Sequence, residues 1–316
     1  MRRVALVLAV LLAGCSGPTY TNPVYAGDAP DPQAIRAGST WYLVHTNTDG
    51  RNVPVLTSPD LVTWTPAGDA LPALPAWADP GRTWAPEIIQ LAPDRFGLYV
   101  TVADRDSGRQ CIARGVAARP EGPYGSVQRL VCQADLGGSI DASPFRDADG
   151  RLYLLWKNDG NAAGQDTWLW AQRLAPDGLS LLGEPARLLR QTEAWEGHVV
   201  EAPFLWRHGA GLLLFYAANA YDTAAYAEGY ARCDTPLGPC RKAPGNPILA
   251  SRGGASGPGH ASMVEQDGRT WLLYHAWPPG AEGSTSPGRR LWLDEVTWDG
   301  DTPVVHGPTD TARPVP

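Results

Sequence analysis

The sequence has 316 residues, enough for one large domain, and a formal net charge of −7 at pH 7. This charge argues against nucleic acid as a partner and against binding to anionic membranes, whereas a neutral oligosaccharide or polysaccharide is compatible with it. The 35 glycines and 30 prolines suit short strands joined by turns, and they interrupt nearly every window in which a long helix could form. A helical bundle and a doubly wound α/β fold are therefore disfavoured.

The first fifteen residues are expected to be an export signal rather than part of the fold. Arg2 and Arg3 precede an apolar stretch over residues 4–13, which is typical of a signal peptide and short for a membrane span. The stretch ends in Leu-Ala-Gly-Cys15, which resembles a bacterial lipobox and implies cleavage before Cys15 and lipidation of its thiol. The alternative is an ordinary secretory peptide with a chance cysteine. We expect residues 16–26 to be a tether and the protein to be exported, either secreted or held on the bacterial membrane only by its lipid.

Five copies of one short phrase follow, at intervals of 54 to 60 residues. Each copy joins a polar or charged residue to a strand-length apolar run, a turn and a second, aromatic-rich run, which together predict a β-hairpin. The copies begin at Asp31, Glu87, Asp141, Glu201 and His260. A hairpin repeated at this period predicts an all-β, five-bladed propeller that forms a single domain over residues 27–316. Its blades would cover residues 27–84, 85–138, 139–198, 199–257 and 258–316.

The first residues of the five copies should lie close together in this fold. The first strand of every blade faces the central axis, so residues at the same phase of the repeat meet around one pocket. We therefore expect four carboxyl groups and the His260 imidazole at the mouth of one channel. Core packing does not explain such a cluster, so it indicates a functional site. Glu196 is a competing acid five residues before Glu201, but it does not share the phase of the repeats.

Four further cysteines are candidates for disulfides if the chain is exported. Three pairings are open, and the local choices, each within one repeat, are Cys111 with Cys132 and Cys233 with Cys240. A zinc site is a poor alternative, since no CxxC spacing occurs and the histidines are scattered.

Seven segments resemble the motifs of glycoside hydrolase family 43, in that family's order. The three acidic segments are Ala29-Pro-Asp31-Pro, Ile140-Asp141-Ala-Ser-Pro-Phe and Val200-Glu201-Ala-Pro. The other four are Ser58-Pro-Asp-Leu-Val-Thr-Trp64, Trp84-Ala-Pro-Glu87, Gly257-Pro-Gly-His260 and Gly288-Arg-Arg290-Leu. The resemblance extends over nearly the whole chain after the signal peptide.

This resemblance implies a five-bladed propeller that hydrolyses glycosidic bonds with inversion. Asp31 would be the general base that activates water, Glu201 the general acid, and Asp141 the residue that holds the acid and raises its pKa. The expected electrostatics agree, because an ionised Asp141 near Glu201 disfavours a second negative charge.

The resemblance also suggests residues that bind the sugar. Trp84 is the candidate for stacking on a sugar ring, with core packing as its alternative. Arg290, or in its place Arg289, would reach a sugar hydroxyl or carboxylate. Glu87 departs from the family habit after Trp-Ala-Pro, which leaves its part in binding open. His260 is either a buried histidine or a site residue, and in related propellers its position helps to organise a calcium or water cluster on the axis. No cofactor is required beyond this candidate structural Ca²⁺, held by His260 through water.

The favoured function is a monomeric α-L-arabinofuranosidase or arabinanase acting on plant cell-wall oligosaccharide or polysaccharide. A β-xylosidase or an exo-galactanase of the same family has similar motifs; many xylosidases carry a C-terminal sandwich, for which this sequence has no room. Motifs of fructan hydrolases and sialidases are absent. A glycan-binding lipoprotein without activity would be favoured by loss of one of the three acids, but all three are present. Exo or endo action and the linkage are left open.

Overall fold

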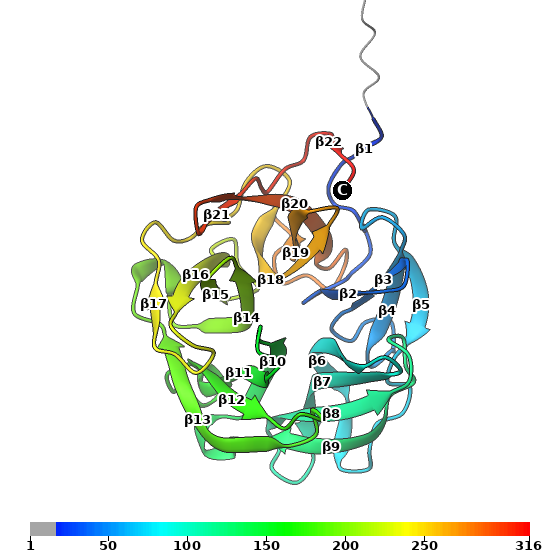
Figure 1. The fold of residues 1–316 in the computed structure, drawn as a ribbon, viewed down its shortest axis with the longest axis vertical. Helices are drawn as coiled ribbons and strands as arrows, with labels where there is room; N and C mark the ends of the chain where they lie inside the picture. Colours follow the sequence, from blue (N-terminus) through cyan, green and yellow to red (C-terminus); the bar gives the residue numbers. More distant parts are fainter. Residues whose placement is uncertain (1–16) are drawn as a thin grey trace, which may run out of the picture.

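The structure, a computed structural model, describes residues 17–316, so the expected signal peptide and Cys15 lie outside the described residues. Five four-stranded antiparallel sheets are arranged around a central axis (Figure 1), which confirms the five-bladed β-propeller. Within residues 17–316 the helical elements are three short 3-10 turns, Ala134–Leu136, Gly160–Ala163 and Ala194–Glu196. In this part of the chain, no helix has the length and apolar character that crossing a bilayer requires.

Each blade uses four consecutive strands. The first blade contains β2 (Gln33–Ala37), β3 (Thr40–Val44), β4 (Pro54–Ser58) and β5 (Thr65–Asp69). The second contains β6 (Ala78–Ala92), β7 (Arg95–Asp104), β8 (Gln110–Ala117) and β9 (Gly125–Val131). The third contains β10 (Ser139–Arg146), β11 (Leu152–Asn158), β12 (Trp168–Leu174) and β13 (Leu181–Arg190). The fourth contains β14 (Val200–His208), β15 (Gly211–Ala218), β16 (Ala227–Cys233) and β17 (Cys240–Lys242). The fifth contains β18 (Ser256–Gln266), β19 (Arg269–Trp277), β20 (Arg290–Asp299) and β21 (Thr302–Val305).

The hydrophobic core lies between neighbouring blades rather than at one centre. The second strand of each blade is apolar on both faces because a neighbouring sheet packs on each side. In β3, Leu43 packs toward the fifth blade and Val44 toward the second, and both are fully buried. The same division recurs around the ring, so every junction between blades has its own cluster of buried side chains.

Two blades begin earlier than the repeat predicted. The second blade begins with β6 at Ala78, not at residue 85, and the fifth begins at Ser256, not at 258. The reason is that pairing with the next strand continues on the N-terminal side of the repeated phrase, as in the pair Ala78 and Asp104. Trp84 therefore belongs to the second blade.

The two ends of the described chain are joined. β1 (Thr19–Tyr20) pairs with β22 (Arg313–Pro314), beside the fifth blade (Figure 1). The Tyr20 hydroxyl donates a hydrogen bond of 2.9 Å to the Leu293 carbonyl, and Tyr20 is buried in the core between the first and fifth blades. From Thr19 onward, the segment expected to be a tether therefore has hydrogen-bonding and apolar partners on the propeller.

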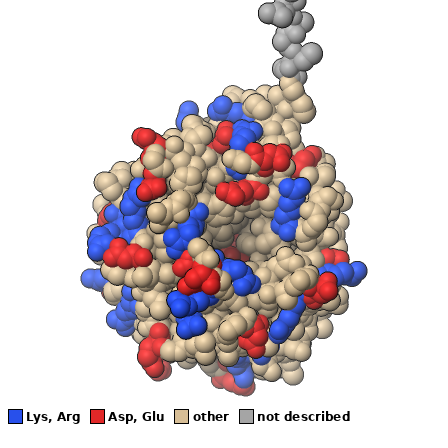
Figure 2. All heavy atoms as spheres, viewed as in Figure 1, with Lys and Arg blue, Asp and Glu red and all other residues tan. Residues whose placement is uncertain are grey.

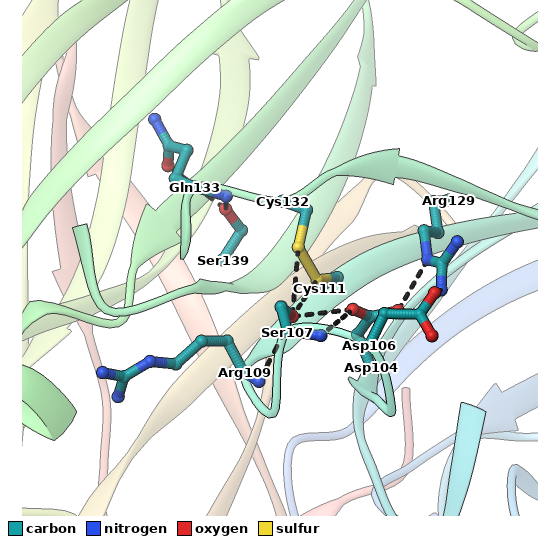
Figure 3. Close-up of a disulfide and its surroundings, with 9 residues drawn as sticks. All are labelled: Asp104, Asp106, Ser107, Arg109, Cys111, Arg129, Cys132, Gln133 and Ser139. Carbon is teal, nitrogen blue, oxygen red and sulfur yellow. Dashed lines mark hydrogen bonds and ion pairs between the residues drawn. A yellow bond between two sulfur atoms is a disulfide. The ribbon is translucent and has the colours of Figure 1, made fainter. Parts of the chain in front are cut away.

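Both expected disulfides are present. Cys111 of β8 bonds to Cys132 just after β9, and Cys233 of β16 bonds to Cys240 of β17. Figure 3 shows the first of these beside Ser107, whose hydroxyl donates to Asp104 at 2.7 Å. Asp104 and the two sulfurs form the one group of three candidate metal ligands found among residues 17–316. The sulfurs are bonded to each other and are not thiolates, so this group is not a metal site.

Candidate active site

A pocket of about 360 Å³ is lined by residues from all five blades. Figure 2 shows a hollow at the centre of the face viewed down the propeller, with acidic and basic side chains around it. The lining residues are Asp31, Thr46, Trp84, Ile140, Asp141, Lys157, Asp159, Asn161, Ala162, Glu201, Tyr221, His260 and Arg289. Four of the five residues that begin the repeated phrases are in this set, and Glu87 is not.

A repeated irregularity in the backbone aims side chains into this pocket. In blades two to five the pairing of the first strand with the second is interrupted at the same point, for example between Ile140 and Ser143. One residue at this point of each blade has a left-handed φ of 43° to 57°; these residues are Asp31, Ala85, Asp141, Ala202 and His260. Interruptions of this kind bend a strand and redirect side chains, and they are common beside active sites.

The left-handed residues show that two of the acids do not hold the position in the repeat that the sequence predicted. Ala85, not Glu87, is equivalent to Asp31, and Ala202, not Glu201, is equivalent to Asp141. Glu87 lies two residues past the redirected position, where it is buried and accepts a 3.0 Å hydrogen bond from Ser143. Burial raises the pKa of Glu87 well above its usual value. Glu87, whose part in binding the sequence left open, is therefore not among the residues that line the pocket.

Glu201 and Trp84 occupy equivalent positions, one residue before the left-handed residue of their blades. Both line the pocket. Trp84, the residue predicted to stack on a sugar ring, thus lies in the pocket. Glu196, the competing acid, is buried outside the pocket and is bound by Lys242 and Tyr216. The preference for Glu201 over Glu196 agrees with this geometry.

Asp31 precedes β2 and is surrounded by donors. Its Oδ1 lies 2.8 Å from Arg289 Nη1 and 3.3 Å from Nδ1 of both His260 and His275. Its Oδ2 accepts a short hydrogen bond from the Thr46 hydroxyl. Burial acts to raise the pKa of Asp31, but the Arg289 guanidinium and the neighbouring imidazoles of His260 and His275 outweigh it and hold this pKa well below its usual value. Asp31 is therefore an ionised carboxylate at neutral pH.

Arg289, and not Arg290, reaches the pocket. The guanidinium of Arg289 lies over the rings of Tyr221 and Trp277, at 5.0 and 5.8 Å from their centroids. Arg290 is the first residue of β20 and pairs with Ala276, and its Nε is buried without a hydrogen-bond partner. Arg289 precedes β20 and lines the pocket, whereas Arg290 does not. The arginine that lines the pocket is thus Arg289, the alternative expected from the sequence, and not Arg290.

Glu201 on β14 has a partner on each oxygen. The Tyr226 hydroxyl donates to Oε1 at 2.7 Å, and the Lys157 ammonium donates to Oε2 at 3.0 Å. Burial acts to raise the pKa of Glu201, but the charge of Lys157 and these hydrogen bonds outweigh it, so this pKa lies below its usual value. Lys157 also lies 3.8 Å from Asp159 Oδ1.

Asp141 connects the third and fourth blades. Its Oδ2 accepts a hydrogen bond of 2.9 Å from the backbone N–H of Ala202, next to Glu201. Burial, reinforced by the negative charge of Glu201, raises the pKa of Asp141 to about 6 against the opposing effect of His260. The sequence predicted that Glu201 would have the raised pKa of the two. In the unliganded protein this direction is reversed, because Lys157 stabilises the ionised form of Glu201.

Lys157, Asp159 and Tyr221 line the pocket in addition to the residues expected from the sequence. One signal was available for Lys157: it is a cation inside the otherwise apolar run Leu-Tyr-Leu-Leu-Trp-Lys of β11. Asp159 and Tyr221 lie in loops, where neither strand alternation nor the repeat predicts direction.

A calcium ion at His260 stays a prediction. His260 lines the pocket, and its Nδ1 is close to Asp31. Within residues 17–316, Nε2 of His275 is a buried nitrogen without a hydrogen-bond partner. Because Nδ1 of His275 accepts the Asp31 N–H, the proton of the neutral ring is on Nε2, which would donate to a water of a hydrated ion and would not bind the ion directly.

Comparisons with known proteins agree with this geometry. The sequence profile of the family described as "Glycosyl hydrolases family 43" matches residues 20–303. The chain is 27% identical over 308 residues to a "Xylosidase/arabinosidase" of Butyrivibrio fibrisolvens, with 90% of this chain and 56% of that protein covered. It is 27% identical over 322 residues to an "Extracellular exo-alpha-(1->5)-L-arabinofuranosidase" of Cellvibrio japonicus, with 87% and 85% covered.

A solved structure described as that of "a thermostable family-43 glycoside hydrolase" superposes with a TM-score of 0.82 at 31% identity, and the match covers 94% of this chain and 99% of that chain. The chain spans about half the length of the first curated relatives it matches.

Proposed function

Because the chain belongs to glycoside hydrolase family 43, a family of inverting enzymes, we propose that it hydrolyses arabinose-containing plant oligosaccharide or polysaccharide as an α-L-arabinofuranosidase or arabinanase. The observation that carries the proposal is one pocket in which the carboxyl groups of Asp31, Asp141 and Glu201 have three different electrostatic environments. Inverting hydrolysis needs such a difference, since one carboxyl group must accept a proton while another gives one.

Asp31 is the base of this mechanism. It takes a proton from water as the water oxygen bonds to the anomeric carbon, and its ionised state supports this role. Glu201 is the acid, which gives its proton to the glycosidic oxygen as the bond from that oxygen to the anomeric carbon breaks. The leaving sugar departs as an alcohol, and the product has the inverted configuration. Asp31 then releases its proton to solvent, and Glu201 takes one up.

Asp141 positions Glu201 and shares its titration. The hydrogen bond from Ala202 to Asp141 fixes the backbone beside Glu201. The two carboxyl groups interact strongly, so their protons leave in steps that belong to the pair. One proton on the pair is the active state. Trp84 and Tyr221, on different blades, are the aromatic surfaces available to a sugar ring, and Arg289 and Asp159 are the polar groups available to its hydroxyls.

A β-xylosidase is the second candidate. It is favoured by a "Beta-xylosidase" of Bacillus subtilis that is 29% identical over 314 residues, with 91% of this chain and 57% of that protein covered. An arabinofuranose and a xylopyranose present similar hydroxyls, so the same carboxyl groups serve either sugar. A pocket that binds glycan without cleaving it is disfavoured by the presence of both an acid and a base.

We also propose that the protein is exported and works as a monomer outside the cytoplasm. The two disulfides suit an oxidising compartment. Lipidation of Cys15 would hold the enzyme at the cell surface. Cys15→Ser should release the protein from the membrane fraction or leave the precursor uncleaved; unchanged membrane association would contradict lipidation.

The test is hydrolysis of nitrophenyl α-L-arabinofuranoside, nitrophenyl β-D-xyloside and linear arabinan by the purified protein. We expect the arabinose substrates to be cleaved faster. The configuration of the first product, followed by NMR, should be inverted. Glu201→Gln and Asp31→Asn should be inactive on arabinan, which excludes a contaminating enzyme. Initial release of the retained anomer would contradict the assignment of Asp31, and inactivity on the whole panel would contradict the proposed function.

A further inference from the structure

One position, on the second strand of each blade or just after it, connects that blade to the next. The pairing registers and the repeat place five residues at this position: Thr46, Thr101, Lys157, Ala217 and His275. At three of them the side chain accepts a hydrogen bond from the left-handed residue of the following blade. Ala85 N–H donates to Thr46 at 2.8 Å, Asp141 N–H to Thr101 at 3.1 Å, and Asp31 N–H to His275 at 3.1 Å.

The other two positions break this rule, and the fold compensates for both. Ala217 has no acceptor, and Glu228 on the third strand of its blade accepts from Ala261 instead, at 3.4 Å. Lys157 carries only donors, and the Ala202 N–H goes to Asp141. Lys157 therefore occupies a position at which other blades place a hydrogen-bond acceptor. It does not accept the backbone N–H that joins neighbouring blades elsewhere in the propeller.

Lys157 is instead turned toward the carboxyl groups of the pocket. Its side chain is 1% exposed, and its ammonium lies 3.0 Å from Glu201 and 3.8 Å from Asp159. A buried ammonium is costly unless it is paired, so this lysine and its acidic neighbours hold one another in place. Two of those neighbours, Glu201 and Asp159, line the same pocket as Lys157 itself.

We propose that Lys157 is a positioning residue, which fixes the carboxyl group of Glu201 and determines the pH range over which Glu201 gives its proton to the leaving group. The inference rests on the proposed function, because it needs Glu201 to be the acid. Besides Lys157, the titratable groups around Glu201 are Tyr226 before β16, Asp141 on β10, Asp159 after β11, His260 on β18 and Glu228 on β16.

The charge of Lys157 acts in a known direction. A cation at 3.0 Å favours the ionised form of Glu201, which makes Glu201 a stronger acid that loses its proton at lower pH. Without this cation the pair of Glu201 and Asp141 holds its proton more tightly. The falling, basic limb of the pH profile then moves to higher pH, while proton transfer to a poor leaving group becomes slower.

Lys157→Met tests the proposal, since methionine keeps the length of the stem and removes the charge. We expect the basic limb of kcat/KM to move upward by about one pH unit or more, because an opposite charge at this distance shifts a pKa by about that much. We expect kcat on arabinan to fall at least about tenfold and kcat on a nitrophenyl arabinofuranoside to fall much less, because that leaving group needs little protonation. Circular dichroism and thermal unfolding check that the variant is folded.

Asp159→Asn is the second variant, which keeps the proposal testable if Lys157→Met does not fold. Asp159 directly follows β11, and its charge also acts on Glu201. Removing a negative charge should move the basic limb downward, opposite to Lys157→Met. A purely structural role of Lys157 predicts lower activity with no displacement of the limb in either variant.

Two failures are distinguishable. If the wild type cleaves arabinan in a Glu201-dependent manner but the basic limb is unmoved in folded Lys157→Met, or moves downward, the inference about Lys157 is overturned. If Lys157→Met is not folded, an unmoved or upward limb in Asp159→Asn overturns it. If the wild type is inactive on the whole panel, or Glu201→Gln retains activity on arabinan, the proposed function itself fails.

Discussion

The guanidinium of Arg289 lies 2.8 Å from the carboxylate of Asp31 and stacks on Tyr221 at the same time. Arg289 belongs to the fifth blade and Asp31 to the first, so this ion pair crosses the junction at which the propeller closes. The Arg289 backbone is held in turn by Asp28, which accepts its N–H at 2.7 Å. The position of the proposed base therefore depends on the loop that precedes β20.

Arg289→Ala should lower kcat/KM by at least about 10²-fold, because Asp31 loses both its charge partner and its fixed position. Arg290→Ala is the matched control, one residue along the chain and outside the pocket, and should lower kcat/KM by no more than a few-fold. Steady-state kinetics on nitrophenyl arabinofuranoside measure both. Equal losses in the two variants would contradict the assignment of Arg289 to the pocket.

Asp31→Ala and Glu201→Ala should both nearly abolish cleavage of arabinan, with losses of about 10²- to 10⁴-fold for each lost proton transfer. They should differ on a dinitrophenyl glycoside. Glu201→Ala should recover most of its rate there, since the leaving group departs without a proton. Asp31→Ala should not recover, because water still needs a base. A full recovery by Asp31→Ala would exchange the two roles.

Asp141→Asn should displace the pH profile. The pKa of Asp141 is about 6, so the wild-type kcat/KM should decline as the pH rises through about 6 and the Glu201–Asp141 pair loses its proton. Asparagine removes the negative neighbour of Glu201, whose pKa then falls further, and the basic limb should move to lower pH. The profile of kcat/KM against pH gives the result; an upward displacement would contradict it.

Thr101→Val should destabilise the protein and lower its activity together. Valine has the shape of threonine but leaves the buried N–H of Asp141 without an acceptor, which should lower the free energy of unfolding by about 1–3 kcal/mol. Thr101→Ser keeps the hydroxyl and is the control. Urea unfolding and kcat measure the two effects. A stable variant with full activity would show that this hydrogen bond does not position Asp141.

The fold followed from the sequence because each blade repeats the same hairpin, and the identity of the family followed from the order of the acidic segments. The phase of the acids did not follow as fully. The repeated phrases were aligned on their polar residues, which put Glu87 two residues and Glu201 one residue away from their structural equivalents. Apolar alternation does not reveal an interrupted strand, since the residues on both sides of the interruption are buried.

The pairing of Lys157 with Glu201 was equally invisible in the sequence. It depends on where two blades lie relative to each other, 44 positions apart in the chain. The repeat predicts which residues share a level of the propeller, but it does not predict which side chain of one blade reaches across to the next.

Three of the hydrogen bonds that join neighbouring blades involve a pocket residue, either Asp31 or Asp141. Attempts to alter specificity by exchanging Asp31, Asp141 or their partners will therefore also change the angle between blades, and with it resistance to heat. Safer sites for engineering are Asn161 and Ala162, which border the pocket from the connection after β11 and whose hydrogen bonds in the described chain stay within that connection. Directed evolution that screens for activity alone should accumulate changes at these loop positions first.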